Sequence, residues 1–392
     1  MSGPLEGIRV LDLTSVVMGP YATQILGDYG ADVIKIEPPR GDVMRQSGPM
    51  KSPNMGHFYL TTNRNKRSLV LDLKKEKAKN VLLQLASKAD VLVYNSRPQS
   101  MARLGLSYEE IYAVSPNIIY VGAYGFSQKG PYADRPAYDD LIQGMCAIPW
   151  LNHKYSGQAP RYAPLVLVDR MLGLQLCNAI TSALFARSRT GKGQKVDVPM
   201  FEGMLSVVLG EHLAGKLFDP PQGEAGYQRS IARDRRPYET KDGYICVLIY
   251  NDKQWSSFFQ VIAQPEIMLE DPRFSSQGNR LANIDYVYGF LSQVLRTRKT
   301  KEWIVLLNDA DIPAAEMLSI DEILTDEHLK ATGFFNYVNH PTEGTMVNMS
   351  VSTEWSETSP TKNLHAPNLG ENNFEILTEL GYSLEEIALI NK

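Results

Sequence analysis

Asp169 is the residue of this sequence whose type and place best suit covalent chemistry. It follows the apolar run PLVLV and opens a stretch in which Leu172, Leu176 and Ile180 recur at helical spacing. We therefore expect it at the N-cap or in the first turn of a helix, where free N–H groups stabilise an ionised carboxylate. Such a carboxylate can attack an activated acyl group, and the same donors can stabilise the oxyanion that forms. On this pattern alone a helix cap is the more ordinary role, and both interpretations stay open.

Basic and amide side chains gather just after the expected strand ends. Each of them alone fits a solvated surface residue. Together they suit a phosphate-rich ligand, because loops at the carboxyl ends of parallel strands converge on one site. These residues are Arg40, Lys66, Arg67, Lys74, Lys75, Asn95, Arg97 and Arg103.

Motifs for nucleotides and metals are missing from the sequence. The loop TSVVMGP (14–20) has neither Gly-x-Gly-x-x-Gly nor a Walker pattern, which argues against a dinucleotide-dependent dehydrogenase. The six histidines show no metal-ligand spacing, so no metal site is expected. Cys146, Cys177 and Cys246 stand far apart in apolar surroundings, and we expect three buried free thiols.

Composition excludes several classes of protein. The chain has 392 residues, of which 43% are hydrophobic, enough for cores in two or three domains. Lys and Arg number 40 against 44 Asp and Glu, and no long basic run offers the footprint that nucleic acid needs. No apolar stretch approaches the roughly 18 residues of a membrane helix, and MSGPLEGIRV does not resemble a signal peptide. We expect a cytoplasmic protein that binds neither nucleic acid nor membranes.

The elements that must position Asp169 and the basic residues follow an α/β pattern. Short apolar runs alternate with helical periodicity, as in parallel strands joined by crossover helices. Ser107 and Glu110 form a capping box for one helix. A linker-like segment at 219–226 precedes a smaller α/β region that reaches about residue 330. The expected strands of the first part are residues 8–13, 31–37, 68–73, 90–94, 117–123 and 196–200.

Eight segments, taken in order, resemble the class III CoA-transferases, the family of formyl-CoA transferase and carnitine CoA-transferase. They span nearly the whole chain and include LEGIRVLDLTSVVMGPYATQILGDYGADVIKIEPPRGD (5–42), VLVYNSRP (91–98) and VDRMLGLQLCNAITSALFARSRTGKGQKVDVPMFE (168–202); the others are residues 63–74, 105–111, 125–139, 239–245 and 366–371. The resemblance implies a Rossmann-like parallel-sheet large domain plus a smaller α/β domain, and an interlocked homodimer. The implied ranges are 1–215 for the N-terminal part of the large domain, 226–330 for the small domain and 331–392 for the return to the large one.

The resemblance also implies site residues and a reaction. Asp169 matches the catalytic aspartate, which would carry first an acyl group as a mixed anhydride and then CoA as a thioester. An acyl-CoA and a carboxylic acid are the implied substrates, with no permanently bound cofactor, no ATP and no metal. The positions that match CoA contacts, or lie near them, are Val17, Met18, Arg40, Lys75, Asn95, Arg97, Met101 and Arg103.

Departures from the family pattern narrow the expected substrate. Ser15 and Val17 stand where formyl-CoA transferase has His and Gln, and its Gly-rich shielding loop is absent, since residues 222–235 read QGEAGYQRSIARDR. We expect a larger carboxylic acid or a dicarboxylate rather than formate or oxalate. Arg233, Arg235 or Arg236 is a candidate partner for a second carboxylate, or equally a solvated side chain.

Two alternatives remain open. The related α-methylacyl-CoA racemases need two acid–base groups and supply a His in a Gly-His-Asp motif, but the matching stretch here is Ala137-Tyr138-Asp139. Tyr138, with an ordinary pKa of about 10, replaces that His poorly, so transferase is favoured. Tyr138 and Asp139 are expected substrate-site residues, although Asp139 fits a helix cap as well. The other alternative is a CoA-binding paralogue without turnover.

Overall fold

The computed structural model describes residues 3–361 and 363–390. The chain forms two compact units: Met1–Cys146, Ala163–Val207 and Lys330–Lys392 make the first, and Ala147–Tyr162 with Val208–Leu329 make the second. The predicted domain ranges 1–215 and 331–392 include residues 1–2, 362 and 391–392, which lie outside the described residues. The division into 1–215, 226–330 and 331–392 stays a prediction.

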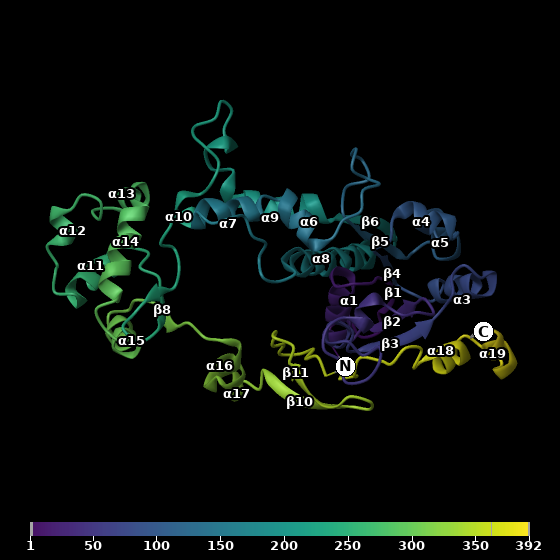
Figure 1. Ribbon diagram of the computed structural model, residues 1–392. Coiled ribbons are helices and arrows are strands. Elements are labelled where there is room, and N and C mark those ends of the chain that lie inside the picture. Colours follow the sequence, from purple (N-terminus) through teal and green to yellow (C-terminus); the bar gives the residue numbers. More distant parts are fainter. Residues whose placement is uncertain (1–2, 362, 391–392) are drawn as a thin grey trace. The chain divides into compact units, whose positions relative to one another are not determined.

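The first unit contains a six-stranded parallel sheet, which confirms the predicted α/β class (Figure 1). Its order is β3-β2-β1-β4-β5-β6, so the order reverses between β1 and β4. Five of the strands lie where the apolar runs predict them, to within two residues. The strands are β1 (Arg9–Leu13), β2 (Asp32–Glu37), β3 (Lys66–Val70), β4 (Val91–Tyr94), β5 (Ile119–Tyr124) and β6 (Gln194–Pro199).

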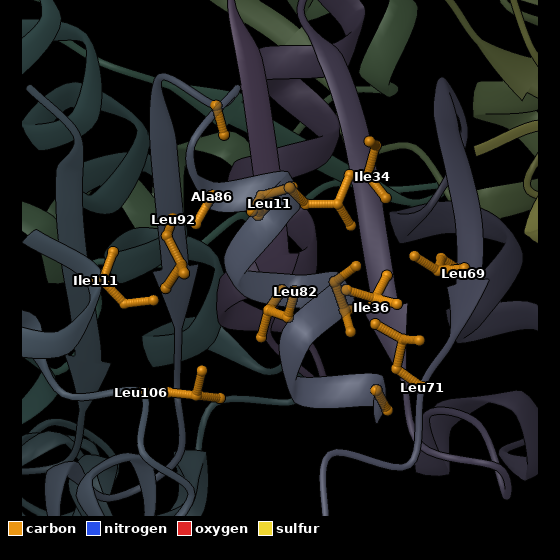
Figure 2. Close-up of a cluster of buried hydrophobic side chains, with 14 of the residues drawn as sticks. Leu11, Ile34, Ile36, Leu69, Leu71, Leu82, Ala86, Leu92, Leu106 and Ile111 are labelled. Carbon is orange, nitrogen blue, oxygen red and sulfur yellow. The ribbon is translucent and has the colours of Figure 1, made fainter. Parts of the chain in front are cut away.

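Helices cover both faces of this sheet. On one face, Leu11, Ile34 and Leu92 pack against Leu82 and its neighbours of α3 (Glu76–Ala86), as Figure 2 shows. Because strand side chains alternate, the intervening positions face the other way, toward α1 (Met18–Asp28) and α8 (Leu167–Thr190). The other helices of this unit are η1 (Val43–Gln46), α2 (His57–Thr62), α4 (Pro98–Arg103), α5 (Tyr108–Val114), α6 (Asp139–Met145), α18 (Asn373–Glu379) and α19 (Leu384–Ile390).

The predicted Ser107–Glu110 capping box is present at the start of α5. A hairpin of β10 (Phe335–His340) and β11 (Gly344–Met349) also belongs to the first unit. Helix α9 (Met200–His212) begins in the first unit, and α17 (Glu327–Ala331) ends in it.

The second unit is built around an aromatic core. Trp255, Phe258, Phe259, Phe274 and Trp303 are fully buried and stack or pack edge to face. A three-stranded antiparallel sheet of β7 (Tyr238–Glu239), β8 (Tyr244–Val247) and β9 (Ala314–Glu316) lies with it. The helices are α7 (Ile148–Ser156), η2 (Ala214–Leu217), α10 (Gln228–Ile231), α11 (Asp252–Val261), α12 (Ile267–Glu270), α13 (Gln277–Ala282), α14 (Ile284–Leu295), α15 (Thr300–Asp309) and α16 (Ile320–Thr325).

One expectation about the cysteines is wrong. Cys146 and Cys177 are buried free thiols as predicted, but Cys246 is exposed. It lies on β8, where exposure alternates along the strand, and its neighbour Ile245 takes the buried side. Among the helices of the described residues, none combines the length and the apolar character needed to cross a membrane.

Candidate active site

Loops at the carboxyl ends of β1, β4 and β5 line one cavity of about 350 Å³ in the first unit. It lies where the strand order reverses, which is where open α/β sheets bind ligands. The first residues of α1, α6 and α9 and the first turn of α8 also line it. The lining residues are Leu13, Ser15, Val16, Met18, Asn95, Ser96, Arg97, Pro98, Ala123, Tyr124, Gly125, Gln128, Ala133, Arg135, Pro136, Ala137, Tyr138, Asp139, Asp169 and Met200.

Asp169 lies in the first turn of α8 and is only 8% exposed. Burial raises the pKa of its carboxyl from 3.8 to about 7; the charge of Asp139 raises the pKa further, and Arg170 lowers it. Within the described chain no group donates a hydrogen bond to this carboxylate, so Asp169 does not cap its own helix. The cap interpretation therefore fails, and an unbonded carboxylate remains at the cavity.

The carboxylate of Asp139, at the start of α6, accepts a backbone hydrogen bond from the first turn of α8, as the carboxylate of Asp169 does not. Its Oδ1 accepts the backbone N–H of Asp169 at 2.9 Å, and its Oδ2 accepts Nε2 of Gln143 at 2.6 Å. Gln143 in turn accepts the N–H of Ala163 at 2.9 Å, in the segment that leads into α8. Asp139 thus fixes the first turn of α8 while its negative charge favours the protonated form of Asp169.

The loop between β1 and α1 forms another part of the wall. Asn95 holds Ser15 by two bonds, accepting its N–H at 3.0 Å and donating to its carbonyl at 2.7 Å. Val16 has φ +72°, a left-handed conformation that a β-branched residue rarely adopts. Val17 is buried just before α1, and Met18 is the first residue of that helix.

The structure brings six of the predicted site residues to this cavity and leaves five outside its lining. Met18, Asn95, Arg97, Tyr138, Asp139 and Asp169 line it together. Val17 is buried beside the cavity. Met101 is buried in the hydrophobic core under α3. Arg40, Lys75 and Arg103 are exposed; Lys75 lies 3.9 Å from Asp72, and Arg103 donates to Oγ of Ser100 at 3.2 Å. Their contacts with CoA stay predictions.

Two other basic residues do not serve as surface cations. Lys66 is fully buried, and its Nζ lies 3.0 Å from Oδ2 of Asp12. Arg67 is paired with Asp32 at 2.8 Å. Both lie on β3 itself rather than in a loop after it, so their inclusion in a phosphate-binding cluster is wrong.

Sequence reasoning missed several lining residues in the segment after β5. Arg135 and Gln128 both line the cavity, and the guanidinium of Arg135 lies 3.8 Å over the ring of Tyr132. A signal was present, because this Gly- and Pro-rich segment directly follows a buried strand and carries a basic residue. Together with Arg97, Arg135 gives the cavity two guanidinium groups that can bind phosphate or carboxylate.

The arrangement suits covalent acyl chemistry. Asp169 is a poorly solvated carboxylate at a helix N-terminus, and desolvation strengthens a nucleophile that attacks when ionised. Tyr138 is 69% exposed, and no histidine stands among the described residues that line the cavity. A racemase needs a second acid–base group opposite the first, and the residue at the position of the racemase His is Tyr138, which favours a transferase.

Comparison with known proteins agrees with this chemistry. The profile of CoA-transferase family III matches residues 5–373. Acetyl-CoA:oxalate CoA-transferase of Acetobacter aceti is 36% identical over 321 residues, which cover 82% of either chain. Succinyl-CoA:glutarate CoA-transferase of Mus musculus is 30% identical over 381 residues, which cover 96% of this chain and 86% of the relative.

A solved structure extends the agreement to the fold. A CAIB/BAIF family protein from Brucella suis matches with a TM-score of 0.80 and 28% identity, over 97% of this chain and 100% of the other. The resemblance inferred from the eight motifs is thereby confirmed. The chain belongs to CoA-transferase family III, and its activity is that of a CoA-transferase.

Proposed function

We propose that this enzyme moves CoA from an acyl-CoA donor to a carboxylic acid through covalent intermediates on Asp169. One observation carries the proposal. Asp169 is buried, accepts no hydrogen bond from the described residues and borders a cavity at the carboxyl end of the sheet. A structural aspartate would be paired or would cap a helix, whereas a nucleophile must be free to attack.

The proposed cycle has two halves. An oxygen of Asp169 attacks the thioester carbonyl of the donor, a C–O bond forms and the C–S bond breaks, giving a mixed anhydride and a CoA thiolate. The thiolate then attacks Cγ of Asp169, which releases the donor acid and leaves an aspartyl-CoA thioester. An acceptor carboxylate reverses the two steps and leaves as the new acyl-CoA. One thioester replaces another, so the cycle needs no permanently bound cofactor, metal or ATP.

The proposed ligand contacts follow the positions of the basic residues. We assign the CoA phosphates to Arg40, Lys75, Arg97 and Arg103, because guanidinium and ammonium groups neutralise phosphate. Asn95 and Met101 are proposed to contact CoA as well. Val17 and Met18 are assigned to the neighbourhood of the thioester.

The acceptor is proposed to be a larger acid or a dicarboxylate. The relative named for glutarate is named for a dicarboxylate acceptor of this kind. We propose that Tyr138 and Asp139 contact the substrate, and Arg135 offers a guanidinium at the same cavity. The enzyme is further proposed to act as a cytoplasmic homodimer.

Trapping with hydroxylamine tests the covalent step. The enzyme is incubated with acetyl-CoA, succinyl-CoA and longer acyl-CoAs, hydroxylamine is added, and peptides are analysed by mass spectrometry. We expect a hydroxamate at Asp169 with at least one donor. Labelling with none of the donors would overturn the proposal.

Asp169→Ala provides the matched activity test. CoA exchange is expected to fall by a factor of about 10⁴ or more, because no other group can carry the acyl chain. CoA binding should change less than about threefold, since the phosphate-binding residues are intact. Deuterium uptake at the α-carbon of a 2-methylacyl-CoA, without exchange, would indicate a racemase instead.

A further inference from the structure

The wall of the cavity contains a strained residue that a buried network of charges holds in place. Val16 lines the cavity with φ +72°, which costs conformational energy for a residue with a branched Cβ. Val16 lies in the loop between β1 and α1, outside the regular hydrogen bonding of either element. Contacts from outside the loop are therefore expected to stabilise the left-handed conformation of Val16.

Asp42, in the turn before η1, contacts the loop directly. Its Oδ1 accepts the N–H of Val16 at 3.2 Å, and also that of Met44 at 3.0 Å. Its Oδ2 lies 3.0 Å from Nζ of Lys35, and this same Nζ donates to the carbonyl of Thr14 at 3.0 Å. The loop is thus held on both sides of Ser15 by one buried ion pair.

The network is rigid and almost inaccessible to water. Lys35 is fully buried and Asp42 nearly so. Asp12 accepts the N–H of Thr14 at 2.9 Å and pairs with Lys66, while Glu37 accepts the N–H of Asp42 at 2.9 Å and pairs with Arg45. A buried ion pair is weak evidence for stability, because desolvation offsets much of the attraction. The direct bonds of the Lys35–Asp42 pair to a strained loop point to a positioning role.

We propose that Asp42 is a positioning residue, which with Lys35 holds Val16 in its left-handed conformation and so fixes the cavity wall beside Asp169. This inference rests on the proposed function of the cavity. Misplacing such a wall by about 1 Å can cost about 10²-fold in rate while the ligand still binds. The role predicts a loss in kcat that is larger than any change in KM.

A double-mutant cycle tests the proposal, because glycine adopts positive φ without a steric penalty. Asp42→Asn removes the ion pair and is expected to lower the rate of hydroxylamine-trapped labelling of Asp169 about tenfold or more, with KM changed less than about threefold. Val16→Gly alone supplies the reference labelling rate against which the double variant is compared. The double variant should recover most of the loss, since a glycine needs no network to reach this conformation.

Glu37→Gln is the matched control. Glu37 belongs to the same network but makes no bond to the loop. Any loss that it causes should not be restored by Val16→Gly. If Asp42→Asn is labelled at Asp169 as fast as the wild type, or if the double variant shows no recovery of the labelling rate, the positioning role is overturned. Absence of labelling in the wild type would instead overturn the proposed function, so the two failures are distinct.

A stability measurement keeps the test valid if Asp42→Asn fails to fold. Val16→Gly should raise the melting temperature by about 2 °C or more, because it removes the strain that the network opposes. Val17→Gly is the comparison: Val17 has an ordinary φ of −125° and a buried side chain, so its melting temperature should fall. A decrease or no change for Val16→Gly would show that Val16 is not strained and would refute the proposal.

Discussion

Asp169 combines two properties that ordinarily oppose each other. Its burial raises the pKa of the carboxyl to about 7, yet the proposed attack requires the ionised form. The arrangement leaves a large fraction of the carboxylate ionised near neutral pH while keeping it poorly solvated and therefore reactive.

The rate profile should report this pKa. We expect kcat/KM to rise with pH through about 7, because kcat/KM follows the ionisation of the free enzyme. Asp139→Asn should move this acidic limb to lower pH, since it removes a neighbouring negative charge while its oxygen can still accept the Asp169 N–H. Asp140→Asn, at the exposed neighbour, is the control and should leave the limb in place. An unmoved limb in Asp139→Asn would show that its charge does not act on Asp169.

The same burial should make stability depend on pH. The folded pKa of Asp169 lies above the unfolded value of 3.8, so the folded state binds more protons between these values and the free energy of unfolding falls as pH rises toward about 7. Asp169→Asn has no carboxyl to ionise, so its free energy of unfolding should not fall in this way. Urea unfolding should show it more stable than the wild type by about 1–3 kcal/mol at pH 8, and by much less at pH 4. An equal difference at both pH values would contradict this mechanism.

Single residues differ in how far the sequence predicts them. Asp169 was found because an acidic residue before an apolar helical stripe is visible locally. The bond from Asp139 to its backbone joins residues 30 positions apart, which no local pattern reveals. Lys66 was misplaced because its charge suggests a surface, while its partner Asp12 lies on a different strand.

At the scale of elements, α1 and α8 meet closely behind the cavity. A Cβ on Gly173 would lie 2.9 Å from the Met18 carbonyl oxygen and 2.9 Å from Cδ1 of Tyr21. Gly173 lies four residues after Asp169, on the same side of α8. The packing of these two helices therefore bears directly on the position of Asp169, the proposed nucleophile.

Gly173→Ala tests this packing. We expect it to lower the free energy of unfolding by about 1–3 kcal/mol, because a backbone oxygen cannot move aside as a flexible side chain can. Activity should fall as well. Gly278→Ala in α13, where a Cβ would meet nothing within 4 Å, is the control and should leave stability unchanged or raise it by up to about 1 kcal/mol. Equal effects of both variants in thermal and urea unfolding would rule out the contact.

Strands were predictable where buried apolar residues recur along them. The runs at 8–13, 31–37, 90–94 and 117–123 correspond to β1, β2, β4 and β5. The run at 68–73 missed the start of β3, because that strand begins with Lys66 and Arg67, whose charges are neutralised by tertiary contacts. The turn expected at 190–195 already contains the start of β6. The start of β3 thus depends on ion pairs with other strands, which the apolar periodicity of the sequence does not reveal.

At the scale of the whole molecule, exposed apolar side chains mark α8. Leu174 is 48% exposed and Phe185 is 65% exposed, in the helix that also carries Asp169. We expect both side chains to become buried in the proposed homodimer. The resemblance to class III CoA-transferases implies an interlocked homodimer, which stays a prediction.

Light scattering tests the assembly. We expect a molar mass of about twice the 43.9 kDa of one chain, and the mass should not fall on dilution. Threaded chains cannot separate unless one of them unfolds, so dissociation should appear only with denaturation. A mass that falls to that of one chain at low concentration would contradict the interlocked arrangement.

The bond between Asp139 and the backbone of Asp169 has a consequence for divergence within the family. One side chain sets both where the reactive group sits and how tightly it holds a proton. Replacing Asp139 with an apolar residue would lower the pKa of Asp169, but it would also remove the bond that fixes the backbone of Asp169. Asn at position 139 would keep the acceptor and remove the charge, and replacing Arg170 would change the local charge without touching the anchor.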